Sequence, residues 1–361
     1  MASLRASILS AAALHLALIP TGAAEAQTKL VYSTYIPESY SVCACDSFFM
    51  DEVSKRTGGK IVFERYHASA LLNATDTAPG IGRGAADLGN AAAGGYNRQF
   101  FPLSNLIMPW VTDSYVAATL AANELYNENA EFQAEYEKQN LKMLYSVIPV
   151  PHSFWSRAPI GTAADFKGKR IRSLLAIGDA VAKLGGTPVA MAFPDAIEAL
   201  SRGAIDGFGN APFDLGVTSG VYKVAKYVTD AGRMGTFALQ STVINLRKWK
   251  ALPPDVQQTM TELSKEAQEC FFKIAQRDVE KSVDILGESK QNEVIVFSDE
   301  EANKLRDTTG KQLWQEWVTL VNKQGYNGQK ILDRYLELVA KYEKDRPTKT
   351  GYQLYKEKYG K

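Results

Sequence analysis

The stretch Lys183–Asn210, KLGGTPVAMAFPDAIEALSRGAIDGFGN, decides the fold class of this chain. Within it, the segment TPVAM (Thr187–Met191) predicts a short strand, and a helix is predicted from about Asp195 to Ser201. A short apolar run followed by a helical pattern is typical of a βα unit. Because the same alternation continues on both sides of the stretch, the sequence predicts an α/β fold.

Towards the N-terminus, the same pattern predicts several further elements. A helix is expected over about Cys43–Lys55, where it ends before Gly58-Gly59, and another near Ile177–Leu184. The expected strands are Lys29–Tyr35, Lys60–Tyr66, Asp87–Ala93, Leu141–Ile148, His152–Arg157 and the segment KRIRS (Lys169–Ser173).

Towards the C-terminus, two features stand out. The run Phe237–Leu246 is long for a strand and could pass between two domains. A long helix is predicted from Pro253-Pro254-Asp255 to about Leu286, with one apolar stripe that packs in the core. The stripe consists of Val256, Met260, Leu263, Ala267, Cys270 and Ile274. Beyond it we expect a strand EVIVF, a helix opened by a capping box at Ser298–Glu301, a helix Gln329–Tyr342 and a peripheral C-terminal helix or tail.

Length and charge limit the possible functions. The chain has 361 residues, 45% of them hydrophobic, which predicts two domains that each bury a core. Its 41 Lys and Arg residues nearly balance 40 Asp and Glu residues, which argues against binding to nucleic acid by bulk charge.

The N-terminus resembles a secretory signal. Arg5 precedes a short apolar run, Ile8–Pro20, and Ala24-Glu25-Ala26 resembles a cleavage site. We predict a cleaved signal peptide over residues 1–26 and an exported protein that is not embedded in the membrane, since no later segment is long and apolar enough to span one. An uncleaved anchor is the alternative.

The cysteines and histidines do not predict a metal site. Cys43, Cys45 and Cys270 are too few for a disulfide scaffold, and His67 and His152 are not near them in sequence. A bridge from Cys43 or Cys45 to Cys270 is possible, and Cys270 is predicted to be a buried thiol. Because common hydrolase, metal and phosphate-loop motifs are also absent, we expect neither an enzyme nor a cofactor.

One basic cluster, KGKRIRS (Lys167–Ser173), is chemically informative. If its last part is a parallel strand, Arg172 lies towards the carboxyl end, where open α/β sheets bind ligands. A guanidinium there can hold a carboxylate through two parallel hydrogen bonds. Lys167, Lys169 and Arg170 are expected in a solvated turn.

The stretch Lys183–Asn210 and this cluster together resemble a signature of TRAP-transporter solute-binding proteins, a periplasmic family related to C4-dicarboxylate receptors. The first part is Gly168-Lys169-Arg170-Ile171-Arg172. The second part includes Gly185, Pro188, Met191, Phe193, Pro194, Ala199-Leu200, Gly203 and Ile205-Asp206-Gly207. The resemblance runs over nearly the whole chain after residue 26.

The resemblance implies a two-lobed periplasmic binding protein of type II, with crossing strands and a long helix that spans both domains. Lobe I is expected over 27–150 plus about 240–285, and lobe II over 151–239 plus about 286–361. Such a protein is periplasmic, binds a small organic acid and delivers it to TRAP membrane permease subunits. The alternative is a protein that presents its ligand to a membrane sensor kinase.

The resemblance also implies a site. Arg172 pairs with the ligand carboxylate, Asn210 hydrogen-bonds the ligand, and lobe I completes the pocket near Tyr35, Asn73, Asn90 and Tyr96. Two departures matter. A further Arg of many relatives falls near His152 here, and the acidic residue and Trp of the metal-coordinating variant are not matched at GFGNAPFD, so we expect no metal-bridged ligand.

The pocket candidates are rich in aromatic rings, which favours an aromatic or apolar monocarboxylate. These candidates are Tyr35, Tyr40, Tyr66, Tyr96, Phe154, Trp155 and Phe213. A C4-dicarboxylate, bound by Arg172 at one end and by His152 or Arg157 at the other, is equally compatible with the sequence.

Overall fold

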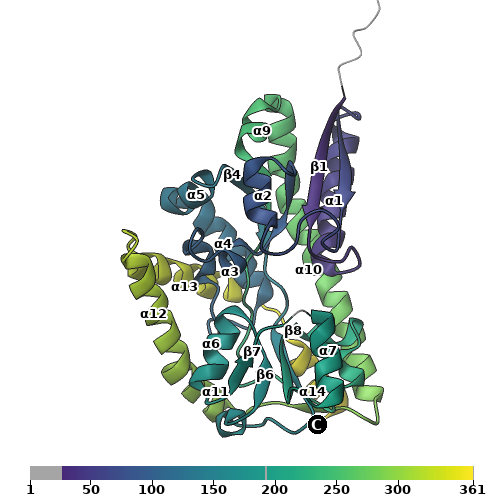
Figure 1. Ribbon diagram of the computed structural model, residues 1–361, viewed down its shortest axis with the longest axis vertical. Coiled ribbons are helices and arrows are strands. Elements are labelled where there is room, and N and C mark those ends of the chain that lie inside the picture. Colours follow the sequence, from purple (N-terminus) through teal and green to yellow (C-terminus); the bar gives the residue numbers. More distant parts are fainter. Residues whose placement is uncertain (1–26, 192, 361) are drawn as a thin grey trace, which may run out of the picture.

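The computed structural model describes residues 27–191 and 193–360, together with all side chains in these ranges except that of Pro194. The predicted signal peptide, residues 1–26, lies outside the described residues. The molecule is elongated, with two α/β halves stacked along its long axis (Figure 1).

The half at the top of Figure 1, here lobe I, is built on a five-stranded sheet in the order β2-β1-β3-β10-β4. The first three strands are parallel, and β10 is antiparallel to both of its neighbours. The strands are β1 (Thr28–Thr34), β2 (Ile61–Tyr66), β3 (Leu88–Ala91), β4 (Leu141–Val147) and β10 (Gln240–Asn245). The helices are α1 (Ser41–Arg56), α2 (Thr77–Arg83), α3 (Ala93–Tyr96), α4 (Tyr115–Glu128), α5 (Ala130–Glu137) and α9 (Leu246–Ala251).

The other half, lobe II, is built on a six-stranded sheet in the order β11-β9-β5-β8-β6-β7. Strands β6, β7 and β8 are parallel, whereas β5 runs antiparallel to β8 and β9. The strands are β5 (His152–Ser156), β6 (Arg170–Arg172), β7 (Thr187–Val189), β8 (Gly207–Pro212), β9 (Tyr227–Thr229) and β11 (Glu293–Ile295). The helices are α6 (Leu175–Lys183), α7 (Phe193–Arg202), α8 (Phe213–Thr218), α11 (Asp299–Leu305) and α12 (Lys311–Asn322).

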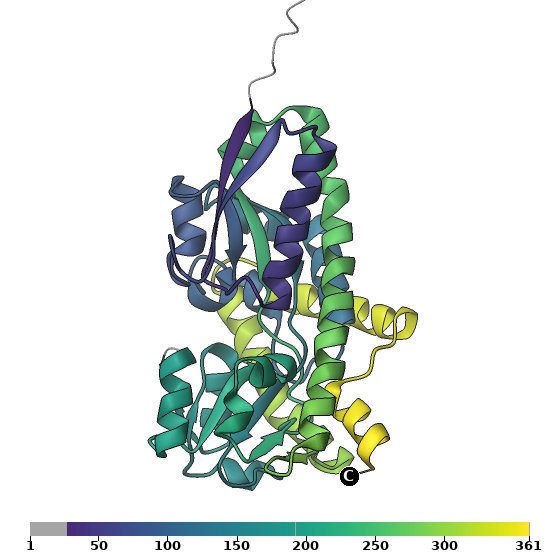
Figure 2. The same cartoon turned by 90° about the vertical axis from the view of Figure 1, so that its right-hand side faces the viewer.

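Helix α10 (Pro254–Glu288) runs along both lobes, as Figure 2 shows. A proline can open a helix because the first helical N–H has no partner within the helix. The predicted stripe is confirmed from Val256 to Ala267, but the buried positions then continue at Phe271 and Ala275. The prediction of a buried Cys270 is therefore wrong, since its side chain is half-buried. Because a helix has 3.6 residues per turn, the buried face shifts slowly around α10 and no longer includes position 270.

Two short segments, residues 148–151 and 230–239, also cross between the lobes. The predicted ten-residue strand Phe237–Leu246 is shorter in the structure, because β10 begins only at Gln240. Ala238 has φ 72, a left-handed backbone conformation that is incompatible with a strand. Phe237 thus belongs to the crossing segment rather than to the sheet.

The C-terminal helices return to earlier parts of the chain. Helix α13 (Gly328–Asp345) packs against α4, where Arg334 pairs with Glu128 at 2.6 Å. Helix α14 (Gly351–Tyr359) packs against α10. The predicted domain boundaries stay a prediction. They place α13 in lobe II, whereas this helix packs on lobe I. The described chain starts at the far end of lobe I and ends at the far end of lobe II (Figures 1 and 2).

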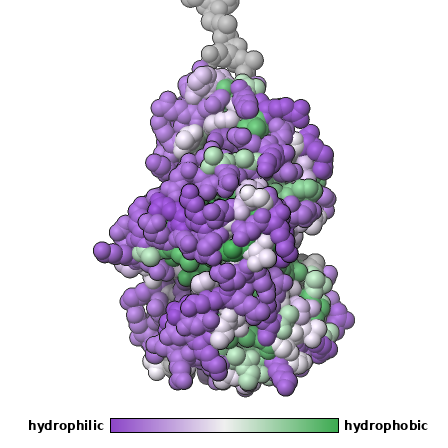
Figure 3. Space-filling model, turned by 90° about the vertical axis from the view of Figure 1, so that its left-hand side faces the viewer, coloured by the Kyte–Doolittle hydropathy of each residue, from purple (hydrophilic) through white to green (hydrophobic). Residues whose placement is uncertain are grey.

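Between the lobes the surface narrows, and apolar residues are visible along this waist in Figure 3. No helix within the described ranges has the length and the apolar character needed to cross a bilayer.

Candidate ligand-binding site

Arg172 is the last residue of β6, at the carboxyl end of three parallel strands, and is only 5% exposed. Its Nε donates a hydrogen bond to the Met191 carbonyl at 3.2 Å. Among the described residues no acidic side chain pairs with it. Burial lowers the pKa of Arg172, but arginine remains charged in proteins, so this edge holds a buried positive charge without a counter-ion.

Two aromatic rings enclose this charge. The Arg172 guanidinium carbon lies 5.0 Å from the ring centre of Phe208 and 5.7 Å from that of Phe193. The two rings are also in edge contact with each other, with their centres 4.9 Å apart. The negative ring faces stabilise a cation that has lost its water shell. Neither phenylalanine was predicted as a site residue, although both lie in the stretch that decides the fold.

His152 lies at the same edge of the sheet. Because β5 is antiparallel to β8, its first residue faces the end where β6 and β8 terminate. The imidazole is 5% exposed, neither ring nitrogen has a hydrogen-bond partner in the described structure, and its centre is 3.9 Å from that of Phe237. Burial, and then the charge of Arg172, lower the pKa of His152 to about 3. His152 is therefore neutral at physiological pH.

Lobe I contributes two tyrosines. The rings of Tyr35 and Tyr96 are in edge contact, with centres 5.5 Å apart, and the Tyr35 hydroxyl donates to Gln240 Oε1 at 3.2 Å. Burial raises the pKa of Tyr96, while the positive charge of Arg172 opposes that rise. This electrostatic coupling shows that Tyr96 of lobe I lies near Arg172 of lobe II.

Asn90, at the end of β3, is fully buried and belongs to a polar network in lobe I. Its Nδ2 donates to the Thr242 hydroxyl at 3.1 Å, and Thr242 in turn donates to Asp46 at 2.7 Å. Tyr32 and Tyr145 also donate to the Asp46 carboxylate. The Oδ1 atom of Asn90 has no partner in the described structure, which leaves one buried acceptor unsatisfied.

Asn210 holds the turn that follows Arg172. It accepts a hydrogen bond from the Leu174 N–H at 2.7 Å and donates one to the Leu174 carbonyl at 3.3 Å. Its φ of 56 lies in the left-handed region, which Asn tolerates better than most residues. Both polar atoms of its side chain thus serve the backbone between β6 and α6.

Three other predicted site residues lie elsewhere. Asn73 is exposed in the loop before α2, where it accepts hydrogen bonds from the Thr75 and Asp76 N–H groups. Trp155 is fully buried, donates to the Ala211 carbonyl and fills the space left by the missing side chain of Gly216. Phe213 packs on Tyr352 of α14, with ring centres 5.0 Å apart. These three side chains already have partners away from Arg172.

The remaining arginines near this sheet lie away from the site. Arg170 is exposed and binds the Asp206 carboxylate and the Gly203 carbonyl, as expected of a surface turn. Arg157 is exposed just beyond the end of β5, and since β5 runs opposite to β6, it lies at the far end of the sheet from Arg172. Arg157 therefore cannot serve as a second cation beside Arg172.

Residues 27–191 and 193–360 contain no group of three or more His, Cys, Asp or Glu side chains that could hold a metal ion. The edge around Arg172 carries a fixed guanidinium, a neutral imidazole and aromatic rings.

Residues 32–319 match the sequence pattern of the bacterial extracellular solute-binding proteins, family 7. The chain belongs to this family. Its members are substrate-binding transport proteins of the periplasm, and the TRAP solute-binding proteins among them bind small organic acids and work with a TRAP permease.

Individual relatives agree with this assignment. The 2,3-diketo-L-gulonate-binding periplasmic protein of Escherichia coli is 25% identical over 84% of this chain and 90% of its own length. A TRAP periplasmic solute-binding protein of Desulfovibrio salexigens is 27% identical, with a TM-score of 0.78 over 88% of this chain and 97% of its own. A TRAP solute-binding protein of Rhodoferax ferrireducens, in complex with copurified benzoate, is 23% identical, with a TM-score of 0.75 over 88% of this chain and 99% of its own. The predicted two-lobed fold with its long helix is confirmed.

Proposed function

We propose that the chain captures a small organic carboxylate between its lobes in the periplasm and delivers it to the membrane subunits of a TRAP transporter. The observation that supports this most strongly is Arg172, a guanidinium that is 5% exposed and without an acidic partner among the described residues. Burying an unpaired charge costs roughly several kcal/mol. A ligand carboxylate would offset that cost through two parallel hydrogen bonds to the guanidinium.

An aromatic or apolar monocarboxylate is the ligand class that we favour. Phe193, Phe208 and Tyr96 supply ring surface around Arg172, where an aromatic acid could pack while its carboxylate meets the guanidinium. A C4-dicarboxylate needs a second positive group. His152 is neutral and Arg157 lies at the other end of the sheet, so neither residue favours that class. The benzoate bound to the Rhodoferax protein also supports the aromatic class.

A thermal-shift screen tests this proposal. The panel pairs benzoate, phenylacetate and mandelate with succinate, malate and fumarate. A ligand at about 100 times its Kd stabilises the native state by about 2.7 kcal/mol, which raises the Tm measurably. We expect an aromatic acid to raise the Tm of the wild type and to leave that of the Arg172→Met variant unchanged.

Arg170→Gln is the matched control, because this neighbouring arginine is exposed and should not affect binding. A response to dicarboxylates alone would contradict the ligand class, and an undiminished response of Arg172→Met would contradict the site. Delivery is tested separately: cells with the permease should take up the acid only when a binding-competent protein is present.

A further inference from the structure

Helices α1 and α10 pack side by side (Figure 2). Cys45 of α1 and Cys270 of α10 lie near each other across this contact. Cys45 is 1% exposed, and Cys270 is half-buried at the edge of the α10 stripe. Phe48, which lies on the same face of α1 as Cys45, lines a groove together with Cys270, and each of the two thiols shifts the pKa of the other. We propose that Cys45 and Cys270 form a disulfide bond that joins α1 to α10.

The structure distinguishes between the two possible partners of Cys270. Residues two apart in a helix point about 200° apart, so Cys43 and Cys45 cannot both face α10. The Cys43 thiol donates a hydrogen bond to the Ile36 carbonyl at 3.5 Å, on the side of β1. Cys45 is therefore the cysteine of α1 that is available for a bond to α10.

Cys270 is also accessible to an oxidant. It lines a surface groove of about 460 Å³, together with Phe48, Ile274, two lysines and two glutamates, namely Lys265, Lys273, Glu266 and Glu269. The contact with Cys45 and the charge of Lys273 lower the pKa of Cys270, whereas the same contact and burial raise the pKa of Cys45. Cys270 is the more exposed of the two thiols and shares a groove with Lys273, which is the character of an attacking thiol.

The reaction is a thiol–disulfide exchange with a disulfide-bearing oxidant, such as an oxidoreductase of an oxidising compartment or oxidised glutathione. The Cys270 thiolate attacks one sulfur of the oxidant, and the other sulfur leaves as a thiolate. Cys45, once deprotonated, then attacks the Cys270 sulfur and releases the second thiolate. Two cysteines lose two electrons and two protons, and the oxidant disulfide becomes two thiols.

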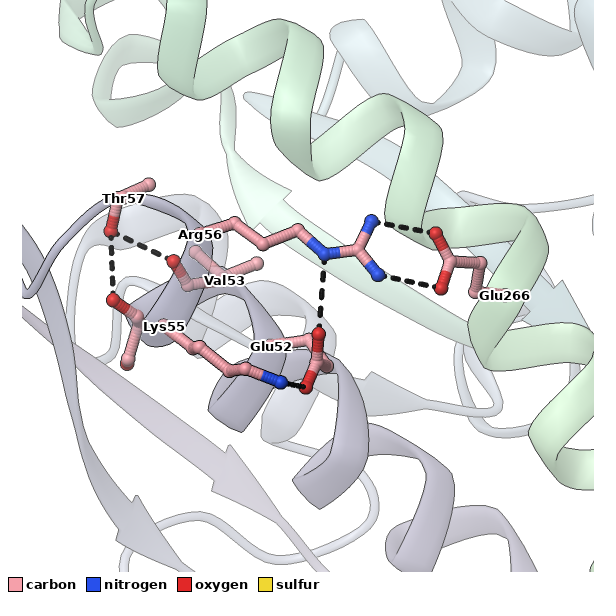
Figure 4. A network of polar contacts seen from close by, with 7 residues as sticks. Glu52, Val53, Lys55, Arg56, Thr57 and Glu266 are labelled. Atoms are coloured by element: carbon pink, nitrogen blue, oxygen red, sulfur yellow. Dashed lines mark hydrogen bonds and ion pairs between the residues drawn. The ribbon is translucent and has the colours of Figure 1, made fainter.

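An ion pair also joins the two helices, about three turns along α1 from Cys45. Figure 4 shows Arg56 of α1 binding Glu266 of α10 through both guanidinium nitrogens, each at 2.7 Å, while its Nε donates to Glu52. Glu266 lies one turn before Cys270 on α10. This pairing opposes sliding of α1 along α10.

Thiol counting after oxidation tests the proposal. The purified protein is treated with oxidised glutathione, denatured, alkylated and analysed by peptide mass spectrometry. We expect a linked peptide pair that contains Cys45 and Cys270, with alkylation only at Cys43, and alkylation of all three cysteines after reduction. The oxidised protein should also have a Tm higher than the reduced protein by about 5 °C.

Cys43→Ser should retain the linked peptides and the Tm shift, whereas Cys45→Ser and Cys270→Ser should lose both. Three alkylated cysteines after oxidation, a bond to Cys43, or glutathione retained on Cys270 without a bridge would each overturn the proposal. The outcome does not depend on ligand binding, so it is independent of the proposed transport function.

Discussion

Arg172 and His152 share one buried edge of lobe II, but burial affects them differently. The guanidinium keeps its charge and is stabilised by the rings of Phe193 and Phe208. The imidazole gives up its proton, because burial and the charge of Arg172 both disfavour the protonated form. The site therefore contains one fixed positive charge, and this sets how binding depends on pH.

Ligand affinity should be nearly independent of pH between about 5.5 and 8. Over this range Arg172 stays charged, His152 stays neutral and a typical carboxylic acid stays ionised. Isothermal titration calorimetry with the acid found in the screen should give dissociation constants that agree within about two-fold. Binding that tightens as the pH falls through 6.5 would instead indicate a protonated His152 and a second anionic group on the ligand.

His152 should also make the protein less stable in acid. Its pKa is about 3 when folded and about 6.5 when unfolded, so between these values the unfolded chain binds an extra proton. Above pH 6.5 the imidazole is mostly neutral in both states, so His152 does not change the free energy of unfolding there. Between pH 7 and pH 5 the free energy of unfolding of the wild type should fall by about 2 kcal/mol relative to that of a His152→Gln variant, as measured by urea unfolding.

The comparison with the variant is needed because the buried carboxyl groups act in the opposite direction. Burial raises the pKa of Asp214 to about 7 and that of Asp230 to about 6, so both groups favour folding as the pH falls. They are present in both proteins and cancel in the difference. Equal pH profiles for the two proteins would show that folding does not lower the pKa of His152.

The sequence pointed to Arg172 because its place at a strand end follows from local pattern alone. Phe193 and Phe208 were missed for a physical reason. Aromatic rings mostly pack in cores, and only the three-dimensional arrangement shows which ring lies over a charge. For the same reason Trp155 and Phe213 were predicted in the pocket, whereas both pack in the interior of lobe II.

Among the structural elements, the turn between β6 and α6 directly follows Arg172 in the chain. Asn210 holds this turn through two hydrogen bonds to Leu174. Asn210→Ala should destabilise the protein by about 2–3 kcal/mol, because it removes both bonds and places Ala at a left-handed φ. Urea unfolding measures this change.

Asn210→Gly is the matched variant, since glycine adopts the same φ without strain and isolates the loss of the hydrogen bonds. It should be about 1 kcal/mol more stable than Asn210→Ala. If both variants fold with wild-type stability but lose ligand affinity, Asn210 contacts the ligand directly, as the family resemblance suggests, and does not act through the turn.

Most elements could be predicted from periodicity, because each of them buries one face. The long helix and the strands around it lie within a few residues of their predicted positions. The predictions that failed depend on the backbone conformation of single residues or on a small shift of the buried face around a helix. Ala238 has a left-handed φ that no side-chain pattern reveals, and the buried stripe of α10 shifts from Cys270 to Phe271 within one turn.

For the whole molecule, contacts across the waist oppose its opening. Arg98, after α3 of lobe I, pairs with Asp179 of α6 in lobe II at 3.3 Å. Nearby, a Cβ atom at Gly95 of lobe I would come within 2.7 Å of the Leu175 side chain in lobe II. A side chain at position 95 would therefore force the Leu175 side chain to move.

Asp179→Asn should weaken ligand binding about two- to five-fold at low salt, because an exposed ion pair contributes about 0.2–1 kcal/mol to the closed state. The difference from wild type should shrink in about 1 M salt, where charges are screened. Calorimetry at both salt concentrations measures it. Glu198→Gln, which breaks a pair with Arg202 within α7, is the control and should leave affinity unchanged.

The arrangement of the C-terminal helices could not be predicted from the sequence. An apolar stripe shows that a helix has a buried face, but it does not show which element covers that face. Helix α13 follows lobe II in sequence and nevertheless packs against α4 of lobe I, where Lys341 also pairs with Glu124 at 3.0 Å. The chain therefore links its two lobes again after the last strand of lobe II.

The placement of the two ends of the described chain has a practical consequence. Because the described chain begins at one extreme of the molecule and the marked C-terminal end lies at the other, one on each lobe, a hinge motion between the lobes changes the relative position of the ends (Figure 2). A donor and an acceptor fluorophore fused at these two positions would convert lobe closure into a change in energy transfer. Such a fusion would work as an optical sensor for the bound acid. The same fusion with Arg172→Met, which should not bind the acid, would serve as its negative control.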